Sequence, residues 1–442
     1  MPFDKIYGVW CDDMIPYIKR IFSSKFAKSV ILISGGTAIA QVLNAVFSPV
    51  ITRIYTPEQY GVLTVYLSLL GIMSIAGSLR YEYAIPISDD DAKASNIIML
   101  CIGILFTVTL FVVLVILNYG DYILKLLDAE ILSRYILLLP VGIFFMGTYN
   151  IFHQWAFRQQ NFKQISRTKI NQSISQNIVA VGLGVLGLGP VGLIVSRIIG
   201  QSAGITTLGL DFFKKIPQYY REIKIRDVHW ALKRYKQFPL YSAPGQILNT
   251  AGIQLPVLFI TSIFGAEVIG FYGLANSIVN MPMSLIGRSV ADVFYSEAAK
   301  IGRTDPRKLK KISNSLLKKL ILLGMIPFLV LVFFGPLLFK IVFGPTWVQA
   351  GIFAQIIAIL VYVRFVFTPI SNIFMVFERQ KDALFLDALR VLLVLVTFGI
   401  AKYFGLSVHM TILIYSISMS IIYFVTFLTA RKIIEFEIKK AQ

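Results

Sequence analysis

The chain has 442 residues, of which 56% are hydrophobic and 15% are charged. A water-soluble protein of this length needs more polar residues to cover its surface, so the composition excludes a soluble globular protein and predicts a polytopic membrane protein. The 42 Lys and Arg residues outnumber the 23 Asp and Glu residues and give a net charge of +19, but they gather between apolar runs, which indicates membrane topology rather than nucleic-acid binding.

Residues 1–28 are expected to form a cytosolic amphipathic lead-in. They contain three aspartates and lack a continuous apolar core before a small-residue cleavage site, which argues against a secretory signal peptide. The two cysteines, Cys11 and Cys101, are too few for a disulfide framework and are expected to be reduced thiols.

Twelve apolar runs follow, each with about the 18 residues or more that crossing a bilayer requires. They are predicted to be helices over residues 29–53, 61–86, 95–117, 135–153, 170–187, 190–210, 240–263, 267–291, 315–338, 350–376, 384–401 and 407–429. The predicted fold class is therefore an all-α polytopic membrane protein with about twelve transmembrane helices.

Basic residues lie mainly on one side of these predicted helices. The segments on the side of the chain ends contain 32 of the 42 Lys and Arg residues, whereas the opposite connections contain five: Arg53, Lys125, Arg134, Lys340 and Lys402. The positive-inside rule therefore predicts that both ends of the chain are cytosolic.

The longest inside segment lies in the middle of the chain. Residues 211–239 include "FFKKIPQYYREIKIRDVHWALKRYKQF", a pattern that predicts a basic amphipathic helix on the membrane surface. This connector separates an N-lobe (29–210) from a C-lobe (240–429), and a cytosolic tail (430–442) follows.

The two predicted lobes share a sequence repeat. "TRIYTPEQYG" (Thr52–Gly61) and "TSIFGAEVIG" (Thr261–Gly270) lie at an offset of 209 residues, each at the outer end of the first helix of its lobe. Because six helices separate the copies, both lobes have the same orientation. We expect two parallel six-helix lobes around a central cavity, related by an axis along the membrane normal.

Eight charged residues fall inside or at the ends of the predicted helices. A charge at mid-bilayer costs at least ~2.5–3.5 kcal/mol, so such residues normally face a wet cavity or a partner. Arg197 and Arg364 are central to their helices and are predicted to face a ligand-binding cavity. The other three arginines either extend to the cytosolic surface or line the same cavity. The predicted substrate-binding residues are Arg80, Arg197, Arg288, Arg364 and Arg390.

The three acids are candidates for ion coupling. Asp292 follows Arg288 by four residues and Asp387 precedes Arg390 by three, so each has a cation within reach on its own helix. Glu82 has no such cation and is the best candidate, with Asp292 and Asp387 as the others. Arginines outnumber acids in this set, which predicts an anionic cargo such as a phosphate or diphosphate.

The histidines and the glycine-rich motif of the sequence do not have the pattern of a metal or cofactor site. His153, His229 and His409 lack metal-ligand spacing, and "GLGVLG" (Gly182–Gly187) lies inside an apolar run with no strand before it. The sequence predicts no metal site, no cofactor and no direct use of ATP by this chain.

Six blocks carry a resemblance to a known family: "PVITRIYTPEQYGVL", "SLRYEYAI", "WAFRQQNFKQISRTKINQSISQ", "FPLYSAPGQILN", "GFYGLANSIVNMPMSLIG" and "FGPTWVQAG". Together they resemble the bacterial oligosaccharide-lipid flippases, the O-antigen and exopolysaccharide translocases of the multidrug/oligosaccharidyl-lipid/polysaccharide exporter superfamily. Of the predicted site residues, only Arg80 and Glu82 lie in one of these blocks.

The resemblance implies a transporter rather than an enzyme. Its cargo would be an undecaprenyl-diphosphate-linked oligosaccharide, moved by alternating access from the cytosolic to the periplasmic leaflet of the inner membrane during lipopolysaccharide or other polysaccharide biosynthesis. The implied partners are membrane lipids, a polysaccharide polymerase and a chain-length regulator, without nucleic acid.

Two alternatives stay open. A multidrug exporter of the same superfamily would carry acids, rather than arginines, deep in its lobes. A membrane glycan polymerase or ligase would require a sizeable periplasmic loop, whereas the longest predicted outer connection is residues 118–134.

Overall fold

The computed structural model describes residues 25–126, 129–302 and 304–440, which form helices and contain no strand. Each of the twelve predicted runs contains most of one long helix, and the run over 350–376 continues beyond its helix through a 3₁₀ segment, η5 (Thr368–Asn372), into the short helix α14 (Ile373–Val376). The long helices are α3 (Lys25–Ile54), α4 (Pro57–Met73), α5 (Asp91–Leu126), α6 (Leu138–Arg158), α7 (Phe162–Val185), α8 (Pro190–Glu222), α10 (Ala243–Phe264), α11 (Ala266–Ile301), α12 (Pro306–Phe343), α13 (Val348–Phe367), α15 (Gln380–Phe404) and α16 (Val408–Lys440). The predicted all-α fold is confirmed.

Eight helical segments of the described chain are long and apolar enough to cross a membrane. The long helices outside this set are α4, α6, α7 and α11, which are shorter or carry more polar side chains. Polar residues of a transmembrane helix normally face other protein or a wet cavity. This applies most clearly to α7, whose polar residues Ser173 and Asn177 are buried.

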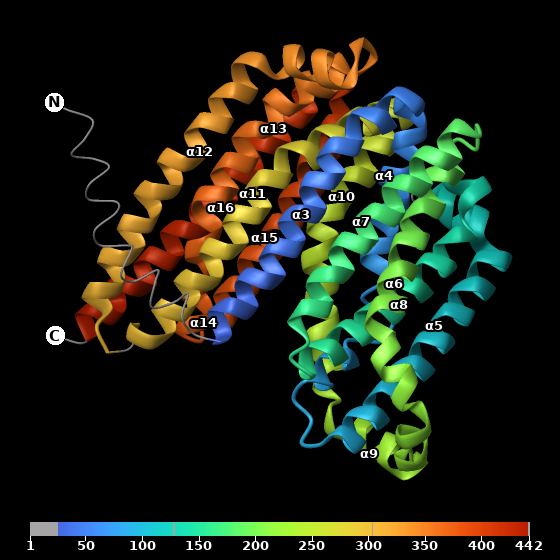
Figure 1. Ribbon diagram of the computed structural model, residues 1–442. Helices are drawn as coiled ribbons and strands as arrows, with labels where there is room; N and C mark the ends of the chain where they lie inside the picture. The colour runs from blue at the N-terminus through green and yellow to red at the C-terminus, as the bar shows by residue number, and fades with distance from the viewer. Residues whose placement is uncertain (1–24, 127–128, 303, 441–442) are drawn as a thin grey trace.

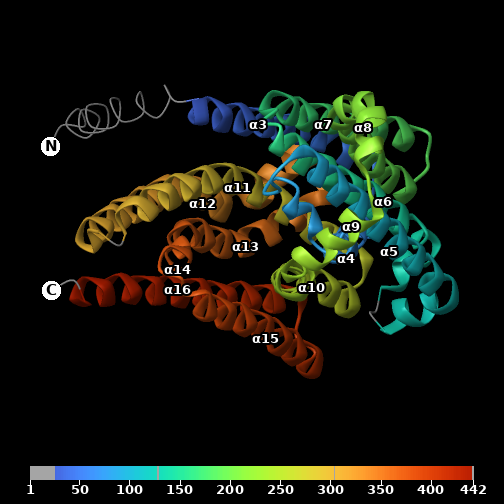
Figure 2. The same cartoon turned by 90° about the horizontal axis from the view of Figure 1, so that it is seen from below.

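Figure 1 shows one group of helices with α5 to α8 and another with α11 to α16, and α3 and α10 run between them in this view. We call α3 to α8 the N-lobe and α10 to α16 the C-lobe. Their ribbons approach each other at one end of the molecule and diverge at the other, where the start of α3 and the end of α16 both lie (Figure 1). From below, α15 and α16 lie at one edge of the C-lobe and α5 lies at the far edge of the N-lobe (Figure 2).

The predicted lead-in and tail are only partly described. Residues 1–24 of the lead-in and 441–442 of the tail lie outside the described residues. Residues 25–28 belong to α3, and residues 430–440 continue α16 as one helix.

The prediction of one helix over residues 61–86 is wrong for the second half of that range. Helix α4 ends at Met73, turns follow, and a short 3₁₀ helix, η1 (Tyr81–Ala84), comes next. Leu79 and Arg80 have φ angles of 50° and 67°, a left-handed conformation that a regular helix does not contain. Tertiary contacts hold this break, because the Tyr81 hydroxyl donates to the Leu232 carbonyl oxygen at 3.0 Å.

The connector differs from the single surface helix that the sequence predicts. Helix α8 continues to Glu222, the separate helix α9 (Ile225–Arg234) follows, and a π-helical turn, η3 (Phe238–Ser242), leads into α10. The Lys224 amide donates to Asn96 Oδ1 at 3.0 Å, and Tyr81 contacts Leu232. Helix α9 is therefore docked on the N-lobe at the diverging end.

The two copies of the repeat contact each other where α4 and α11 cross. A Cβ atom on Gly61 would overlap the Ala266 carbonyl oxygen, and one on Gly270 would overlap the Pro57 carbonyl oxygen. At the repeat offset of 209, Gly61 corresponds to Gly270 and Pro57 to Ala266, so the contact is reciprocal. Both helices begin here and run away from it in the same sense, as parallel lobes require.

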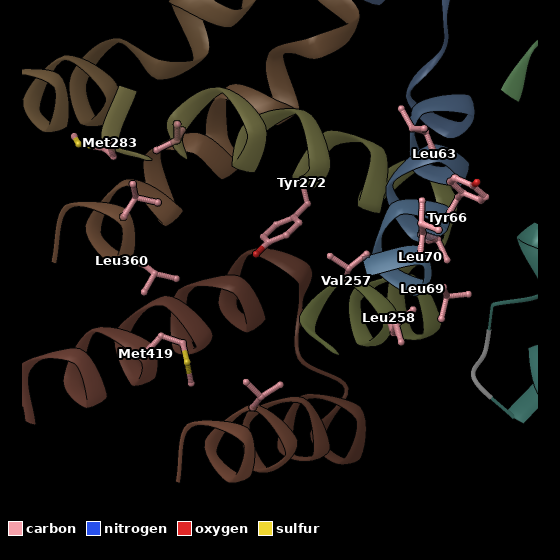
Figure 3. Packing of buried hydrophobic residues seen from close by; sticks show 14 of the residues in the cluster. Leu63, Tyr66, Leu69, Leu70, Val257, Leu258, Tyr272, Met283, Leu360 and Met419 are labelled. Atoms are coloured by element: carbon pink, nitrogen blue, oxygen red, sulfur yellow. The ribbon is translucent and has the colours of Figure 1, made fainter. Parts of the chain in front are cut away.

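Further contacts extend this inter-lobe seam, by which we mean the packing of residues 52–71 against residues 254–273 and 343–347. The Trp347 indole N–H donates to the Thr52 carbonyl oxygen at 2.8 Å, and the Ser68 hydroxyl donates to the Gln254 carbonyl oxygen at 3.1 Å. Leu69 of α4 lies beside Leu258 of α10 on its apolar side (Figure 3). The lobes are thus joined at the end opposite the chain ends.

The seam predicts a difference between two glycine substitutions. Gly61→Ala places a methyl group against backbone that has no room to yield, which should cost about 1–3 kcal/mol and lower the melting temperature in detergent. Gly103→Ala in α5 is the matched control, because a Cβ there meets no atom within 4 Å. Equal melting temperatures for the two variants would show that α4 and α11 do not pack this closely.

Candidate functional site

A cavity of about 260 Å³ lies at the diverging end of the N-lobe, between the broken end of α4, α6 and α7. We call it the Glu82 cavity. It is lined by Ser74, Ile75, Arg80, Glu82, Tyr83, Tyr149, Asn150, His153, Gln154 and Lys169. The break after Met73 positions this site, because it turns Arg80 and Glu82 out of the helix and toward α6 and α7.

Arg80 is held by an aromatic ring. Its guanidinium carbon lies 3.9 Å from the centre of the Tyr83 ring, and Nη1 donates to the Tyr83 hydroxyl at 3.2 Å. Its Nε is buried and has no hydrogen-bond partner. Among the described residues Arg80 takes part in no ion pair, so its charge is not neutralised by a bonded acid.

Glu82 lies in the connection between α4 and α5 and is 6% exposed. Its carboxylate accepts a hydrogen bond from the Ser78 hydroxyl at 2.5 Å. Burial raises the pKa of Glu82, and the Ser78 hydrogen bond and the Arg80 charge oppose this rise only in part. The carboxyl is therefore suited to gain and lose a proton.

The opposite wall of the Glu82 cavity comes from α6 and α7. The Lys169 ammonium lies 5.0 Å from the centre of the Tyr149 ring, and the His153 ring is 5.8 Å from the same ring. The Tyr149 hydroxyl is buried without a hydrogen-bond partner. Asn150 and Gln154 add two amide groups.

A second cavity of about 140 Å³, the Arg197 cavity, is lined by Tyr66, Leu67, Leu70, Gly71, Gly142, Met146, Gln176, Arg197, Ile198 and Gln201. Arg197 Nη1 donates to Gln176 Oε1 at 3.0 Å, and the Gln172 amide donates to Gln201 Oε1 at 3.1 Å. Lys169, Gln172 and Gln176 follow each other at helical spacing along one face of α7. This polar strip runs from the Glu82 cavity to the Arg197 cavity.

Arg364 has a similar setting in the C-lobe. Its guanidinium donates to Asn280 Oδ1, and the Asn280 amide donates to the Asn276 carbonyl oxygen at 2.7 Å. Neither Arg364 nor Arg197 forms an ion pair within the described residues. Each lobe thus holds one partly buried arginine whose partner is a neutral amide.

The remaining predicted site residues have different surroundings. Arg390 pairs with Asp387 at 3.1 Å and lies over the Tyr423 ring, so these two neutralise each other as their spacing permits. Arg288 and Asp292 are both exposed, and no ion pair joins them in the described chain. An exposed pair gains little energy, so helical spacing alone does not bring the two together.

The five arginines are therefore not gathered at one of these cavities: Arg80 lines the first and Arg197 the second. Their roles in binding stay predictions. Sequence reasoning missed Tyr149, Lys169 and Gln176, because a polar residue in an otherwise apolar run was not weighed unless it was charged and deep. The polar spacing along α7 was the signal that would have found Lys169 and Gln176.

Comparison with known proteins finds a family model that matches most of the chain. Residues 50–351 match the family model described as "Polysaccharide biosynthesis protein". The teichuronic acid biosynthesis protein TuaB of Bacillus subtilis (strain 168) is 21% identical over 240 residues. That match covers 52% of this chain and 47% of the relative, so the chain matches about half the length of this relative.

Solved structures share the fold over nearly the whole chain. An inward-facing multidrug resistance MATE family transporter of the MOP superfamily superposes with a TM-score of 0.73 at 15% identity, covering 94% of this chain and 100% of that chain. An outward-facing MATE family transporter gives 0.64 at 15% identity, covering 95% and 98%. A MOP superfamily transporter from Pyrococcus furiosus also gives 0.64, at 14% identity, covering 95% and 98%. The chain has the two-lobe helical fold of these transporters.

Proposed function

The chain belongs to the polysaccharide biosynthesis protein family, and from this premise we propose that it moves an undecaprenyl-diphosphate-linked oligosaccharide from the cytosolic to the periplasmic leaflet of a bacterial inner membrane. A polysaccharide polymerase and a chain-length regulator would act on the glycan after it crosses. The similarity to a teichuronic acid biosynthesis protein supports a polysaccharide cargo.

The observation that carries this proposal is the pairing of Arg197 and Arg364 with amides. Burying a cation within the membrane is costly, and an acid placed beside it would cancel its charge. Gln176 and Asn280 hold these guanidiniums without cancelling that charge. Each lobe therefore keeps a positive charge for an anionic ligand, and guanidinium geometry suits the paired oxygens of a phosphate.

The arrangement of the lobes suits alternating access. They meet at the seam and diverge at the end that holds the start of α3, the end of α16 and α9 (Figure 1). The positive-inside rule assigns that end to the cytosol, so this arrangement would receive cargo from the cytosolic leaflet. The better match to the inward-facing transporter, 0.73 against 0.64, supports the same orientation.

Ion coupling would involve Glu82. Asp387 is paired with Arg390, and Asp292 is exposed. Glu82 is buried beside a cavity, and among the described residues no ion pair holds it ionised. It is the acid best placed to exchange a proton while cargo binds.

The first prediction of this proposal concerns two substitutions that add a negative charge without changing the size of the side chain. Gln176→Glu and Asn280→Asp would each convert an amide partner into an acid that pairs with Arg197 or Arg364. We expect each to reduce glycan export by at least about tenfold, because the cation is neutralised for the cargo. Export is measured as surface polysaccharide in cells that depend on this chain, with the variant's amount in the membrane measured in parallel.

The matched control is Gln176→Leu, which removes the hydrogen bond to Arg197 but leaves its charge free. It should export more glycan than Gln176→Glu. Wild-type export by Gln176→Glu, or a loss no larger than that of Gln176→Leu, would contradict the role given to the uncancelled charge.

The second prediction concerns orientation. Single cysteines at the exposed positions Thr56 and Gly405 should react with an impermeant thiol reagent from the periplasm, because they lie at the end away from the chain ends. Cysteines at the exposed positions Lys233 and Lys308 should react only after the cytosolic side is opened. Labelling of Lys308→Cys in intact cells would contradict the predicted orientation and place the chain ends in the periplasm.

A further inference from the structure

The Glu82 cavity is too small for a whole lipid-linked oligosaccharide. Its volume of about 260 Å³ lies below the ~300–1,000 Å³ of pockets that hold drug-sized ligands. It is large enough to hold one ring-sized polar group. A cargo with a diphosphate and several sugars would therefore place only one of its parts here.

The lining is suited to the hydroxyl groups of a sugar. Glu82 uses one hydrogen bond from Ser78, and an ionised carboxylate has further acceptor sites. The Tyr149 side chain and the Arg80 guanidinium also line this cavity. Asn150 and Gln154 supply amide groups that can both donate and accept hydrogen bonds.

The charges around Glu82 determine which kind of ligand would bind with a different affinity when Glu82 gains a proton. Arg80 and Lys169 give two positive charges, and Glu82 gives one negative charge when ionised. The other ionisable groups near it are the buried Cys101 thiol of α5 and His153 of α6, while Arg158 is engaged with Asp91 at 2.9 Å. A proton on Glu82 therefore raises the positive charge of the cavity.

This charge change has opposite effects on two kinds of ligand. An anion would bind more tightly when Glu82 is protonated, so proton and anion would travel together, and an exported anion would carry protons out of the cell. An uncharged sugar hydroxyl would instead donate to the ionised carboxylate, a strong acceptor that protonation removes. Sugar and proton then compete, which is the linkage that lets inward proton flow drive export.

We infer that the Glu82 cavity binds one uncharged sugar residue of the cargo, and that its hydroxyl groups compete with a proton for the Glu82 carboxylate. This inference rests on the proposed function. The diphosphate of the cargo binds elsewhere, and the amide-held arginines Arg197 and Arg364 are the groups suited to it.

Binding of three matched probes to the purified chain in lipid nanodiscs tests the inference. The first probe is a short prenyl diphosphate capped with a methyl ester, here called the bare diphosphate, the second carries one uncharged hexose (glucose, galactose or N-acetylglucosamine) in place of the methyl group, and the third carries glucuronate. At pH 8 at least one hexose probe should bind about tenfold more tightly than the bare diphosphate, as expected for a hydrogen bond to a charged acceptor. At pH 5.5 this advantage should shrink.

Two substitutions separate this site from the general binding of the lipid. Glu82→Gln should reduce the hexose advantage and remove its dependence on pH, while the affinity for the bare diphosphate stays near that of the wild type. Gln154→Leu, which removes an amide group from the cavity lining, should reduce the advantage severalfold, and Tyr403→Phe, at an exposed position on α15, should leave it unchanged.

The outcomes distinguish the two proposals. Failure to bind the bare diphosphate would count against the proposed function itself. If the bare diphosphate binds and no hexose probe binds more tightly than it at either pH, the sugar site is overturned and the proposed function survives. The same holds if only the glucuronate probe binds more tightly than the bare diphosphate, and does so at pH 5.5.

Discussion

The contact between α4 and α11 is the constraint on which the architecture depends. Two glycines at equivalent places in the repeat, Gly61 and Gly270, let each helix start touch the backbone of the other. Thr64 and Gly273, three residues further along, are also equivalent and also in contact. Because equivalent residues meet, the lobes are related by an axis between the two helices, and closing one end in this way lets the other end diverge.

The polar groups follow from this arrangement. Apolar helices such as α5, α12 and α15 can face lipid, whereas α7 carries polar residues that require protein or water around them. The break after Met73 adds a buried carboxylate to the N-lobe, and the polar strip of α7 links it to Arg197. In the C-lobe, α11 supplies Asn280 to Arg364. Arg197 and Arg364 themselves lie on α8 and α13, which pack against the seam helices α4 and α11.

The sequence predicted the twelve long helices and the repeat, because length, apolarity and self-similarity are local signals. It did not predict the break before Arg80, since a left-handed backbone held by the hydrogen bond from Tyr81 to Leu232 depends on a segment 151 residues away. Spacing correctly permitted the Asp387–Arg390 pair but gave no reason for Arg288 and Asp292 to remain apart. The amide partners of Arg197 and Arg364 come from other helices, so only the packed structure identifies them.

The central claim is that two lobes rock about their contact and expose an anionic lipid site to each side in turn. Distances between spin labels in proteoliposomes test it most directly, with one pair at Lys233 and Lys308 and another at Asp121 and Tyr403, all exposed positions. Adding a lipid-linked diphosphate oligosaccharide under an inward proton gradient should populate a state in which the first distance shortens and the second lengthens. Two distances that stay constant, or that change in the same direction, would contradict the account.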